Sequence, residues 1–300
     1  MFSIKDHLAT LVDARIKEPP VANDWIRASG FAFDCMREEV LAHRHQKHRE
    51  EVWDADSVVN LSLGTAMHIG MQDLLLSALL IGTWECTACG KIHGTRKSDA
   101  DPELRRIKYH TPHDQLTSAD RQAFRYLIDR VVLNAVPKPV MCGAESYLGV
   151  CDSEEFRYVE SWVGDLDLRI GGHPDGFLRV PWQETVGIFE GKSISQKGIW
   201  EVRAVPKVEH LYQVHIYMWA TGLTWANVLY WCKGPHGIKA FVEHHVERQE
   251  PIIEMIKDVV GEYRAAIGQP LAVLPRRICK HAYCKRALEC VVVEPCFDVA

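Results

Sequence analysis

The 300-residue sequence has no apolar run long enough to cross a membrane, and polar residues interrupt the apolar segment 74–81 on both sides. The first residues also lack the apolar core of a secretory signal peptide. These absences favour an intracellular protein. The sequence further contains no internal repeat, no low-complexity stretch and no Walker A loop. A repeat architecture is therefore excluded, and any ATP-driven unwinding must come from another protein.

The sequence also has no excess of positive charge, because it contains 35 Lys and Arg and 40 Asp and Glu, for a formal net charge of −5. This balance argues against a surface coated with nucleic-acid-binding charge. Basic residues nevertheless cluster at 43–49 (HRHQKHR) and at 276–286. Either cluster can contact phosphates locally or can be an ordinary solvated surface. The content of 47% hydrophobic and 25% charged residues is that of a globular protein with one large domain or two small ones.

The ten cysteines do not predict a secreted disulfide framework, because nothing at the start of the chain indicates secretion. In a reducing compartment, clustered cysteines are typical metal ligands. Cys86 and Cys89 lie in a C-x-x-C-G sequence, whose tight turn lets two thiolates bind one metal ion, and this pattern predicts a zinc knuckle. Two thiols in an ordinary turn are the alternative interpretation.

Residues 164–217 contain the strongest chemical signal. Alternating apolar residues predict a strand over 166–170, the sequence GGHPDG (171–176) predicts a turn, and 177–180 and 186–192 predict two more strands. Asp175 then lies at the start of one strand, and Glu190 and Lys192 lie near the end of another, on the same face. Two carboxylates and an ammonium at a sheet edge suit Mg²⁺ or Mn²⁺ beside a scissile phosphate. The bare D-x₁₄-E-x-K pattern is also compatible with a hairpin turn and a surface ion pair.

Two predicted helices flank this signal. Apolar residues recur at helical spacing from Leu63 onward, and His68 lies beside that apolar stripe. On its own, His68 is more typical of a buried core histidine. Gln213 and Tyr217 are four residues apart and therefore share one face of a second predicted helix.

These segments together resemble the RecB-like branch of the PD-(D/E)xK nucleases, of the iron-sulfur type, which includes AddB-like and CRISPR-associated exonucleases and possible phage members. The family's motifs occur here in order, as G-x-x-x-H at Gly64–His68, D at Asp175, E-x-K at Glu190–Lys192 and Q-x-x-x-Y at Gln213–Tyr217.

The resemblance implies a role for each of these residues. It implies that His68, Asp175 and Glu190 bind the catalytic Mg²⁺ or Mn²⁺. It makes Lys192 the catalytic lysine, and Gln213 and Tyr217 residues that orient the substrate or the active-site strand. It also implies that the substrate is DNA.

The resemblance also implies two structural metal groups. The family joins an N-terminal cysteine to three C-terminal ones around a [4Fe-4S] cluster, which here indicates Cys35, Cys279, Cys284 and Cys290. The first C-terminal spacing is x₄ rather than the usual x₂, Met36 replaces the proline of the family's C-P-R, and Cys296 is held in reserve. Zinc at this site, or structural thiols alone, are the alternatives.

Some phage relatives have a second knuckle, C-x-x-C-G, and Pro139 stands here where its first cysteine would be. Cys142 becomes the third zinc ligand. The fourth stays open among four residues, of which we choose the first: Cys151, His93, His110 and His113.

We therefore expect an α/β, restriction-endonuclease-like fold with a mixed central sheet flanked by helices. The expected segments are an N-terminal helical region with one cluster cysteine (1–60), a first core helix (61–83), a zinc-binding insertion (84–151), the nuclease core (152–246) and a C-terminal helical, iron-sulfur region (247–300). The cluster would join the two ends of the chain.

The expected function is a divalent-metal-dependent DNA exonuclease that acts on single strands or duplex ends in recombination, repair or phage DNA processing. We expect it in the cytoplasm of a bacterial or phage-infected cell, without a membrane partner. A helicase or a recombinase is the kind of protein partner that this function suggests. A catalytically silent nucleic-acid-binding module and a structure-specific endonuclease are the alternatives.

Overall fold

The structure of the protein is a computed structural model that describes residues 25–31, 35–45, 55–94, 102–146, 149–232, 241–270, 274–288 and 290–297. The chain forms two compact units, one made of residues 24–31 and 63–253 and the other of the N-terminal and C-terminal parts. Within the described ranges, no helix is both long and apolar enough to cross a membrane. Residues 1–22, whose sequence indicates a short helix ended by Pro19–Pro20, and part of the basic cluster at 43–49 lie outside the described residues.

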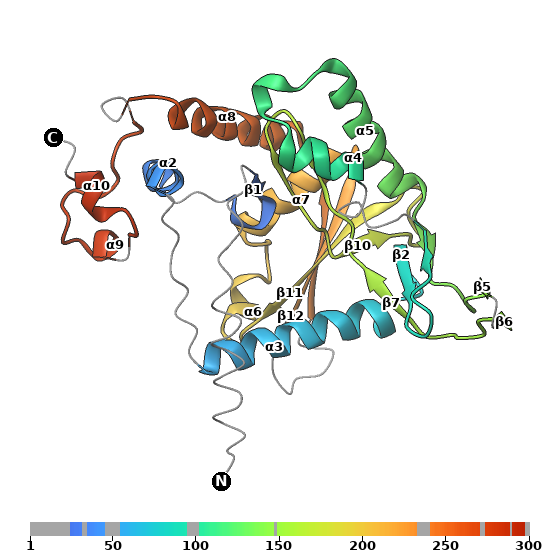
Figure 1. Cartoon of the computed structure of the whole chain (residues 1–300). Helices are drawn as coiled ribbons and strands as arrows, with labels where there is room; N and C mark the ends of the chain where they lie inside the picture. The colour runs from blue at the N-terminus through green and yellow to red at the C-terminus, as the bar shows by residue number, and fades with distance from the viewer. Residues whose placement is uncertain are drawn as a thin grey trace, which may run out of the picture. The chain divides into compact units, whose positions relative to one another are not determined.

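A mixed sheet forms the centre of the larger unit, and the predicted mixed α/β architecture with flanking helices is confirmed (Figure 1). β11 and β12 pair in parallel, and the other described neighbours in this sheet pair antiparallel. The strand order is β13 (Phe241–Glu247), β12 (Trp225–Cys232), β11 (Gly187–Ile194), β10 (Gly176–Leu178), β2 (Leu80–Cys86) and β3 (Ile92–His93), and β4 (Val136–Pro137) and β7 (Phe156–Val159) also pair with β2.

β7 and β10 lie one after the other along β2. Val159 pairs with Thr83 and Phe177 pairs with Ile81, so the end of β7 meets the start of β10 opposite Gly82. The chain between these two strands makes the hairpin of β8 (Val163–Asp165) and β9 (Ile170–Gly172), to which β1 (Ile26–Arg27) adds in parallel. Residues 160 and 175, distant in sequence, are thereby brought to the same place.

The predicted strand over 166–170 is wrong, because residues 166–169 form the turn between β8 and β9. Asp165 accepts the Leu168 N–H at 2.9 Å, and Arg169 has a φ of +47°. Leu166 is buried in a second apolar cluster rather than on a sheet face. Apolar residues that alternate over five positions fit a strand, but they also fit a tight turn that packs on a hydrophobic cluster.

The helices of the larger unit differ in part from the expectation. α3 (Ala55–Gly70) continues into a π-helical turn over Met71–Leu75, but β2 begins at Leu80, so the predicted core helix over 61–83 runs into a strand. The apolar residues at 79–81 fit either a helix or a buried strand. α7 (Val208–Thr221) packs against β11 and β12 on one side and against β8 and β9 on the other, and ends at Gly222 with a φ of +76°.

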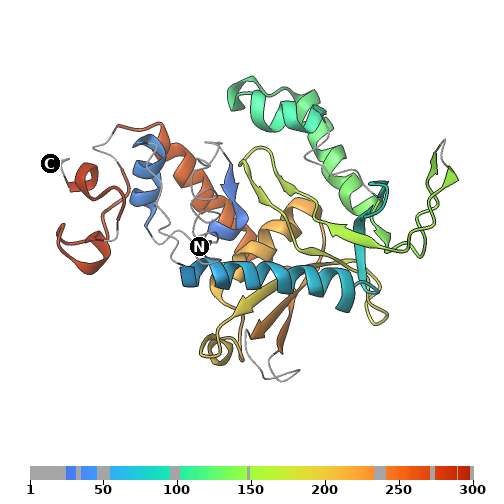
Figure 2. The same cartoon turned by 60° about the horizontal axis from the view of Figure 1, so that its bottom comes forward.

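The segment expected to be a polar zinc-binding insertion contributes to an apolar core that it shares with residues outside 84–151. α4 (Pro102–Arg105) and α5 (Ser118–Leu133) are its helices, and a reciprocal capping box between Thr117 and Asp120 starts α5. The hairpin of β5 (Glu145–Ser146) and β6 (Gly149–Val150) projects from the edge of this unit (Figures 1 and 2). The core residues are Leu104, Ile107, Leu116, Phe124, Ile128, Trp162 and Leu166.

The smaller unit joins the two ends of the chain. Arg44 of α2 (Met36–His45) donates to the carbonyl oxygen of Ile267 at 3.1 Å, and Arg37 donates to that of Pro275 at 3.3 Å. The other helices of this unit are α8 (Glu250–Ile267), most of which belongs to it, α9 (Lys285–Leu288) and α10 (Val293–Phe297). N-terminal and C-terminal residues therefore share one unit.

Candidate functional site

Asp175 and Glu190 come together through strand register. β10 and β11 are antiparallel with Gly176 opposite Phe189, which places Asp175 beside Glu190. Asp175 accepts the backbone N–H of Gly191 at 2.6 Å through Oδ2. Both side chains lie in the protein interior, because Asp175 is 7% exposed and Glu190 is 2% exposed. Two carboxylates are thus held close together in a poorly hydrated place.

One oxygen of Glu190 is fully engaged and the other is not. Lys192 Nζ lies 2.6 Å from Glu190 Oε1, and Gln213 Nε2 donates to the same oxygen at 2.9 Å. Gln213 also donates to the Tyr217 hydroxyl at 3.0 Å, which in turn donates to the carbonyl oxygen of His173 at 3.2 Å. Among the described residues, buried Oε2 of Glu190 has no hydrogen-bond partner. A buried acceptor without a donor is costly, and a cation would satisfy it.

His68 and a residue absent from the sequence prediction, Glu160, complete this site. Nδ1 of His68 lies 3.4 Å from Oδ1 of Asp175. His68, Glu160 and Asp175 each offer a ligand atom, and these atoms all lie within 4.8 Å of one another. Glu190, the third ligand predicted from sequence, is not in this group but lies beside Asp175. We call His68, Glu160, Asp175, Glu190 and Lys192 the carboxylate site.

Gln72 orients Glu160 and was also missed by the sequence analysis. It follows His68 by four residues, so both project from the same side of the helix. Its Nε2 donates to Glu160 at 3.0 Å and to the carbonyl oxygen of Asp175 at 2.7 Å. No motif marks Glu160 or Gln72. The one usable signal is that Glu160 is a carboxylate within the largely apolar segment 156–162, whose sequence is typical of a strand.

The charges of the carboxylate site shift one another's pKa values. Burial, and then the charge of Asp175, raise the pKa of Glu190 to about 8, although Lys192 opposes this. Loss of hydration and Asp175 likewise raise the pKa of Glu160. Burial alone would lower the pKa of Lys192, but Glu190 and Asp175 outweigh it and raise that pKa. Lys192 therefore stays protonated at neutral pH, and the carboxylates favour a bound cation.

Gly191, between Glu190 and Lys192, allows a close approach behind the site. A Cβ at this position would lie 2.3 Å from the ring of Trp231, which is 1% exposed. The same Trp231 ring contacts the His68 imidazole edge to face, with centroids 4.9 Å apart. A side chain at residue 191 would displace Trp231, and through it His68.

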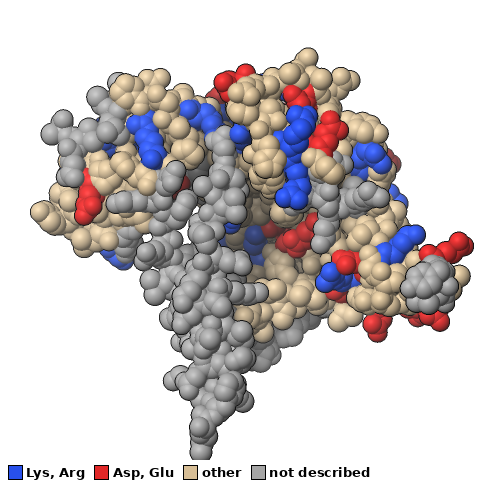
Figure 3. Space-filling view, viewed as in Figure 1, with Lys and Arg blue, Asp and Glu red and all other residues tan. Residues whose placement is uncertain are grey.

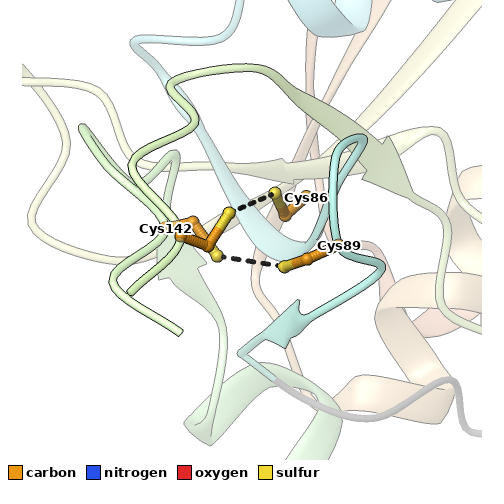
Figure 4. A group of neighbouring side chains, drawn as sticks. Cys86, Cys89 and Cys142 are labelled. Carbon is orange, nitrogen blue, oxygen red and sulfur yellow. Dashed lines mark hydrogen bonds between the residues drawn. The ribbon is translucent and has the colours of Figure 1, made fainter. Parts of the chain in front are cut away.

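A second candidate metal site lies at the far end of β2. The thiols of Cys86, Cys89, Cys142 and Cys151, which we call the thiol site, all lie within 4.8 Å of one another. Cys86 and Cys151 sulfurs are 3.9 Å apart, and Cys89 and Cys142 sulfurs are 3.5 Å apart. Figure 4 shows the labelled thiols pointing toward one another. Four convergent thiols are the donor set of a structural zinc.

Backbone hydrogen bonds preset the thiol site. Gly90 N–H donates to the Cys86 carbonyl at 2.9 Å and closes the knuckle turn, with a φ of +73° at Gly90. Across the β5–β6 hairpin, Gly143 N–H donates to the Cys151 carbonyl at 2.9 Å. The backbone N–H of Cys89 is the main cause that lowers the pKa of Cys86 to about 6. Cys151 thus comes from across a hairpin, which the proline at 139 does not disturb.

Of the open alternatives for the fourth ligand, one also lies at the thiol site. Nε2 of His93 is 3.5 Å from the Cys142 sulfur. His113 instead lies 2.9 Å from the carbonyl oxygen of Asp167. Cys86 and Cys142 are the two buried residues of the thiol site, and burial raises the pKa of Cys142 to about 12.

The predicted cluster cysteines lie in the smaller unit, and most of them line one small pocket. Cys35, Cys279, Cys290 and Cys296 line it, together with Glu38 and Arg286. Cys284 does not line this pocket, but its thiol forms a hydrogen bond with Cys279.

These thiols form two subsets. Burial, and then the hydrogen bond with Cys284, raise the pKa of Cys279 to about 11. The negative charge of a nearby Cys35 thiolate raises this pKa further. Cys290 instead interacts with Glu38 and Cys296.

No protein-family model and no curated protein sequence matches the chain. Among solved structures, it is similar to LHK-Exo, an alkaline exonuclease from Laribacter hongkongensis, at 16% identity and a TM-score of 0.32 over 54% of this chain and 84% of that chain. For LHK-Exo in complex with dAMP, the identity is 19% and the TM-score 0.32, over 36% of this chain and 56% of that one. This match spans about half the length of that relative. SSO0001 is similar at 11% identity and a TM-score of 0.39, over 87% and 86% of the two chains. Scores this low establish neither a family nor an activity.

Proposed function

We propose that the chain is a divalent-metal-dependent deoxyribonuclease, an exonuclease that hydrolyses phosphodiester bonds of single strands or duplex ends in recombination, repair or phage DNA processing. One observation carries the proposal. Glu190 is buried beside Asp175, shares one oxygen between Lys192 and Gln213, and leaves its other oxygen without a partner among the described residues. An ion pair that only stabilised the fold would not require a buried carboxylate with one oxygen left unpartnered.

The donor set fits Mg²⁺ or Mn²⁺. His68, Glu160 and Asp175 would hold the ion, and the unpartnered, buried oxygen of Glu190 is a further donor beside Asp175. Carboxylate oxygens with one imidazole suit these hard cations. A bound cation would supply Lewis-acid chemistry to the scissile phosphodiester.

The remaining residues have roles that follow from their contacts. Protonated Lys192 would donate a hydrogen bond to a phosphate oxygen or to an attacking water, and would stabilise negative charge that develops in the transition state. Gln213 fixes the rotamer of Glu190, and Tyr217 fixes Gln213 through hydrogen bonds of 2.9 and 3.0 Å. Both would act as positioning residues.

The thiol groups would support the fold. We assign zinc to Cys86, Cys89, Cys142 and Cys151, because their four sulfurs converge. We assign a [4Fe-4S] cluster to Cys35, Cys279, Cys284 and Cys290, with Cys296 beside Cys290 as the reserve ligand.

End-labelled single-stranded and duplex DNA, incubated with Mg²⁺, Mn²⁺ or chelator, tests the proposal. We expect cleavage with metal, none with chelator, and a loss of about 100- to 1,000-fold in Lys192→Ala, the size of effect seen when one transition-state donor is removed. Asp175→Ala should lose at least as much. Lys257→Ala and Asp167→Ala remove a lysine and an aspartate from exposed ion pairs and serve as matched controls.

Cleavage of closed circular single strands would favour the endonuclease alternative. DNA binding without cleavage under any metal would leave a silent binding module. Wild-type rates in Lys192→Ala or Asp175→Ala would refute the assignment of the site.

A further inference from the structure

The segment 195–208 combines an exposed tryptophan with local positive charge. It leaves β11 shortly after Lys192, forms α6 (Gly198–Glu201) and enters α7, which carries Gln213 (Figure 1). Trp200 is 61% exposed. The segment holds three cations and one anion, so its charge is 3 − 1 = +2 in a chain of net charge −5. These residues are Lys197, Arg203, Lys207 and Glu201.

The exposure of Trp200 is built into the segment. Ile199 is 7% exposed and Val202 is fully buried, so the two smaller apolar residues on either side anchor the turn while the largest points out. Ser195 accepts the Gly198 N–H at 3.1 Å through Oγ, and a ring nitrogen of His244 lies 2.6 Å from the Val202 carbonyl oxygen. An indole left outside a firmly anchored turn forgoes the stabilisation of burial.

The other end of the segment is tied to the strand beside Lys192. Lys207 N–H donates to the Tyr230 hydroxyl at 3.0 Å, and Tyr230 is paired with Lys192 in the parallel register of β11 and β12. The segment therefore starts and ends next to the carboxylate site.

Arg203 holds the indole in one orientation. Its guanidinium carbon lies 3.5 Å from the centroid of the Trp200 ring, which is a close cation–π stack. One face of the ring is covered by a planar cation, and the ring remains largely exposed. Both groups are flat, and both can stack on a nucleobase.

We propose that Trp200 and Arg203 form a stacking site for an unpaired base of single-stranded DNA, with Lys197 and Lys207 beside its phosphates. The occupant is single-stranded because bases within a duplex are already stacked on their neighbours. This inference rests on the proposed function and narrows its substrate, since the site would guide a single strand toward the carboxylate site.

Binding is measured in the full chain in an Asp175→Ala background, without added divalent cation, by the fluorescence anisotropy of a labelled oligothymidylate. We expect Trp200→Ala to weaken the Kd about 5- to 100-fold, the range for loss of one stacked base. Trp200→Phe should stay within about threefold because it keeps an aromatic face. Arg203→Ala should weaken binding more than Arg203→Lys, which keeps the charge alone.

Trp182 supplies a matched control. It is 73% exposed and lies in the loop that precedes β11, at the opposite end of the strand from Trp200. Trp182→Ala should bind like the parent, and both alanine variants should unfold at the parent's temperature because both side chains are exposed. A blunt duplex should bind equally to the parent and to Trp200→Ala.

Unchanged oligothymidylate binding in Trp200→Ala would overturn the stacking site, and so would an equal loss for single strands and the blunt duplex. A change in oligomeric state without any change in DNA binding would show that Trp200 serves a protein contact and would overturn it too. A wild-type protein that binds through Trp200 but cleaves no DNA would refute the proposed hydrolysis alone. Cleavage of single strands with unchanged kcat/KM in Trp200→Ala would refute the stacking site alone.

Discussion

The carboxylate site and the thiol site are built around the same sheet from segments far apart in sequence, but they differ in how far the backbone supports the ionised side chains. At the thiol site, backbone hydrogen bonds close each turn and lower the pKa of Cys86, although burial raises the pKa of Cys142. At the carboxylate site, burial and like charge raise the pKa values of Glu190 and Glu160, and one oxygen of Glu190 is unpartnered among the described residues. The first arrangement suits a structural metal, whereas the second holds unfavourable charge that chemistry can use.

The charge on the surface of the protein is of mixed sign. Figure 3 shows basic and acidic side chains interspersed over the face that it presents, rather than one continuous basic surface. With a net charge of −5, long-range attraction of the proposed DNA substrate would be weak, so local groups would have to provide recognition.

Removing metal ligands from the thiol site should give the largest loss of stability. In Cys86→Ser, Cys89→Ser, we expect zinc to be lost, iron to be retained and the melting temperature to fall by about 10 °C or more, because binding energy at a structural zinc is folding energy. Metal analysis and thermal unfolding measure both. Cys232→Ala, at the end of β12 and outside both cysteine sets, is the control. Unchanged zinc content would mean that the knuckle is only a turn.

The cysteines of the smaller unit extend the comparison, since they form two subsets around a small pocket rather than one convergent group. Protein prepared without air should be brown, and Cys284→Ala should lose iron and several degrees of melting temperature, because such a cluster needs four ligands. Iron content and visible absorbance test this. Cys296→Ala should retain iron if Cys290 is the ligand. Colourless protein with zinc in both sites, despite ample iron, would rule the cluster out.

Removing a metal-binding residue from the carboxylate site should not destabilise the metal-free protein, in contrast to the thiol site. Without divalent cation, Asp175→Asn should melt within about 2 °C of wild type, because it removes the repulsion with Glu190 together with the attraction to Lys192, while an amide oxygen can still accept the Gly191 N–H. Mn²⁺ should raise the melting temperature of wild type but not of the variant. A variant that melts well below wild type in chelator would mean that Asp175 stabilises the fold and that the contrast between the two sites fails.

The sequence predicts the parts of the carboxylate site that local patterns encode. Glu190 and Lys192 follow from strand alternation, and Gln213 and Tyr217 follow from helical spacing, and the structure brings their side chains together. Glu160 could not be found in this way, because it reaches Asp175 only through the alignment of β7 and β10 along β2.

The same limit applies to the thiol site and to the turn over 166–169. Cys151 reaches Cys86 through hairpin pairing, which spacing alone leaves open among several residues. Residues 166–169 alternate like a strand, but Leu166 is drawn into the apolar cluster beneath α5. Strand pairing and tertiary packing decided these outcomes, and the periodicity of a single segment does not contain them.

A small, pH-dependent effect should appear beside the carboxylate site, at His210. Its Nδ1 lies 2.7 Å from the Tyr230 hydroxyl. Burial, and then the charges of Lys192 and Lys207, lower the pKa of His210 to about 3. Between about 6.5 and 3, the unfolded chain therefore binds a proton that the folded chain does not, so this residue makes stability fall as pH falls through that window.

His210→Asn should remove this contribution while its amide oxygen still accepts the Tyr230 hydroxyl. At pH 8, where the imidazole is neutral in both states, variant and wild type should melt within about 1 °C of each other. At pH 5, the variant should have lost about 1–3 °C less than wild type, as measured by thermal unfolding without metal. Parallel pH profiles for the two proteins would show that His210 takes up its proton in the folded state, and that Lys192 and Lys207 do not set its charge.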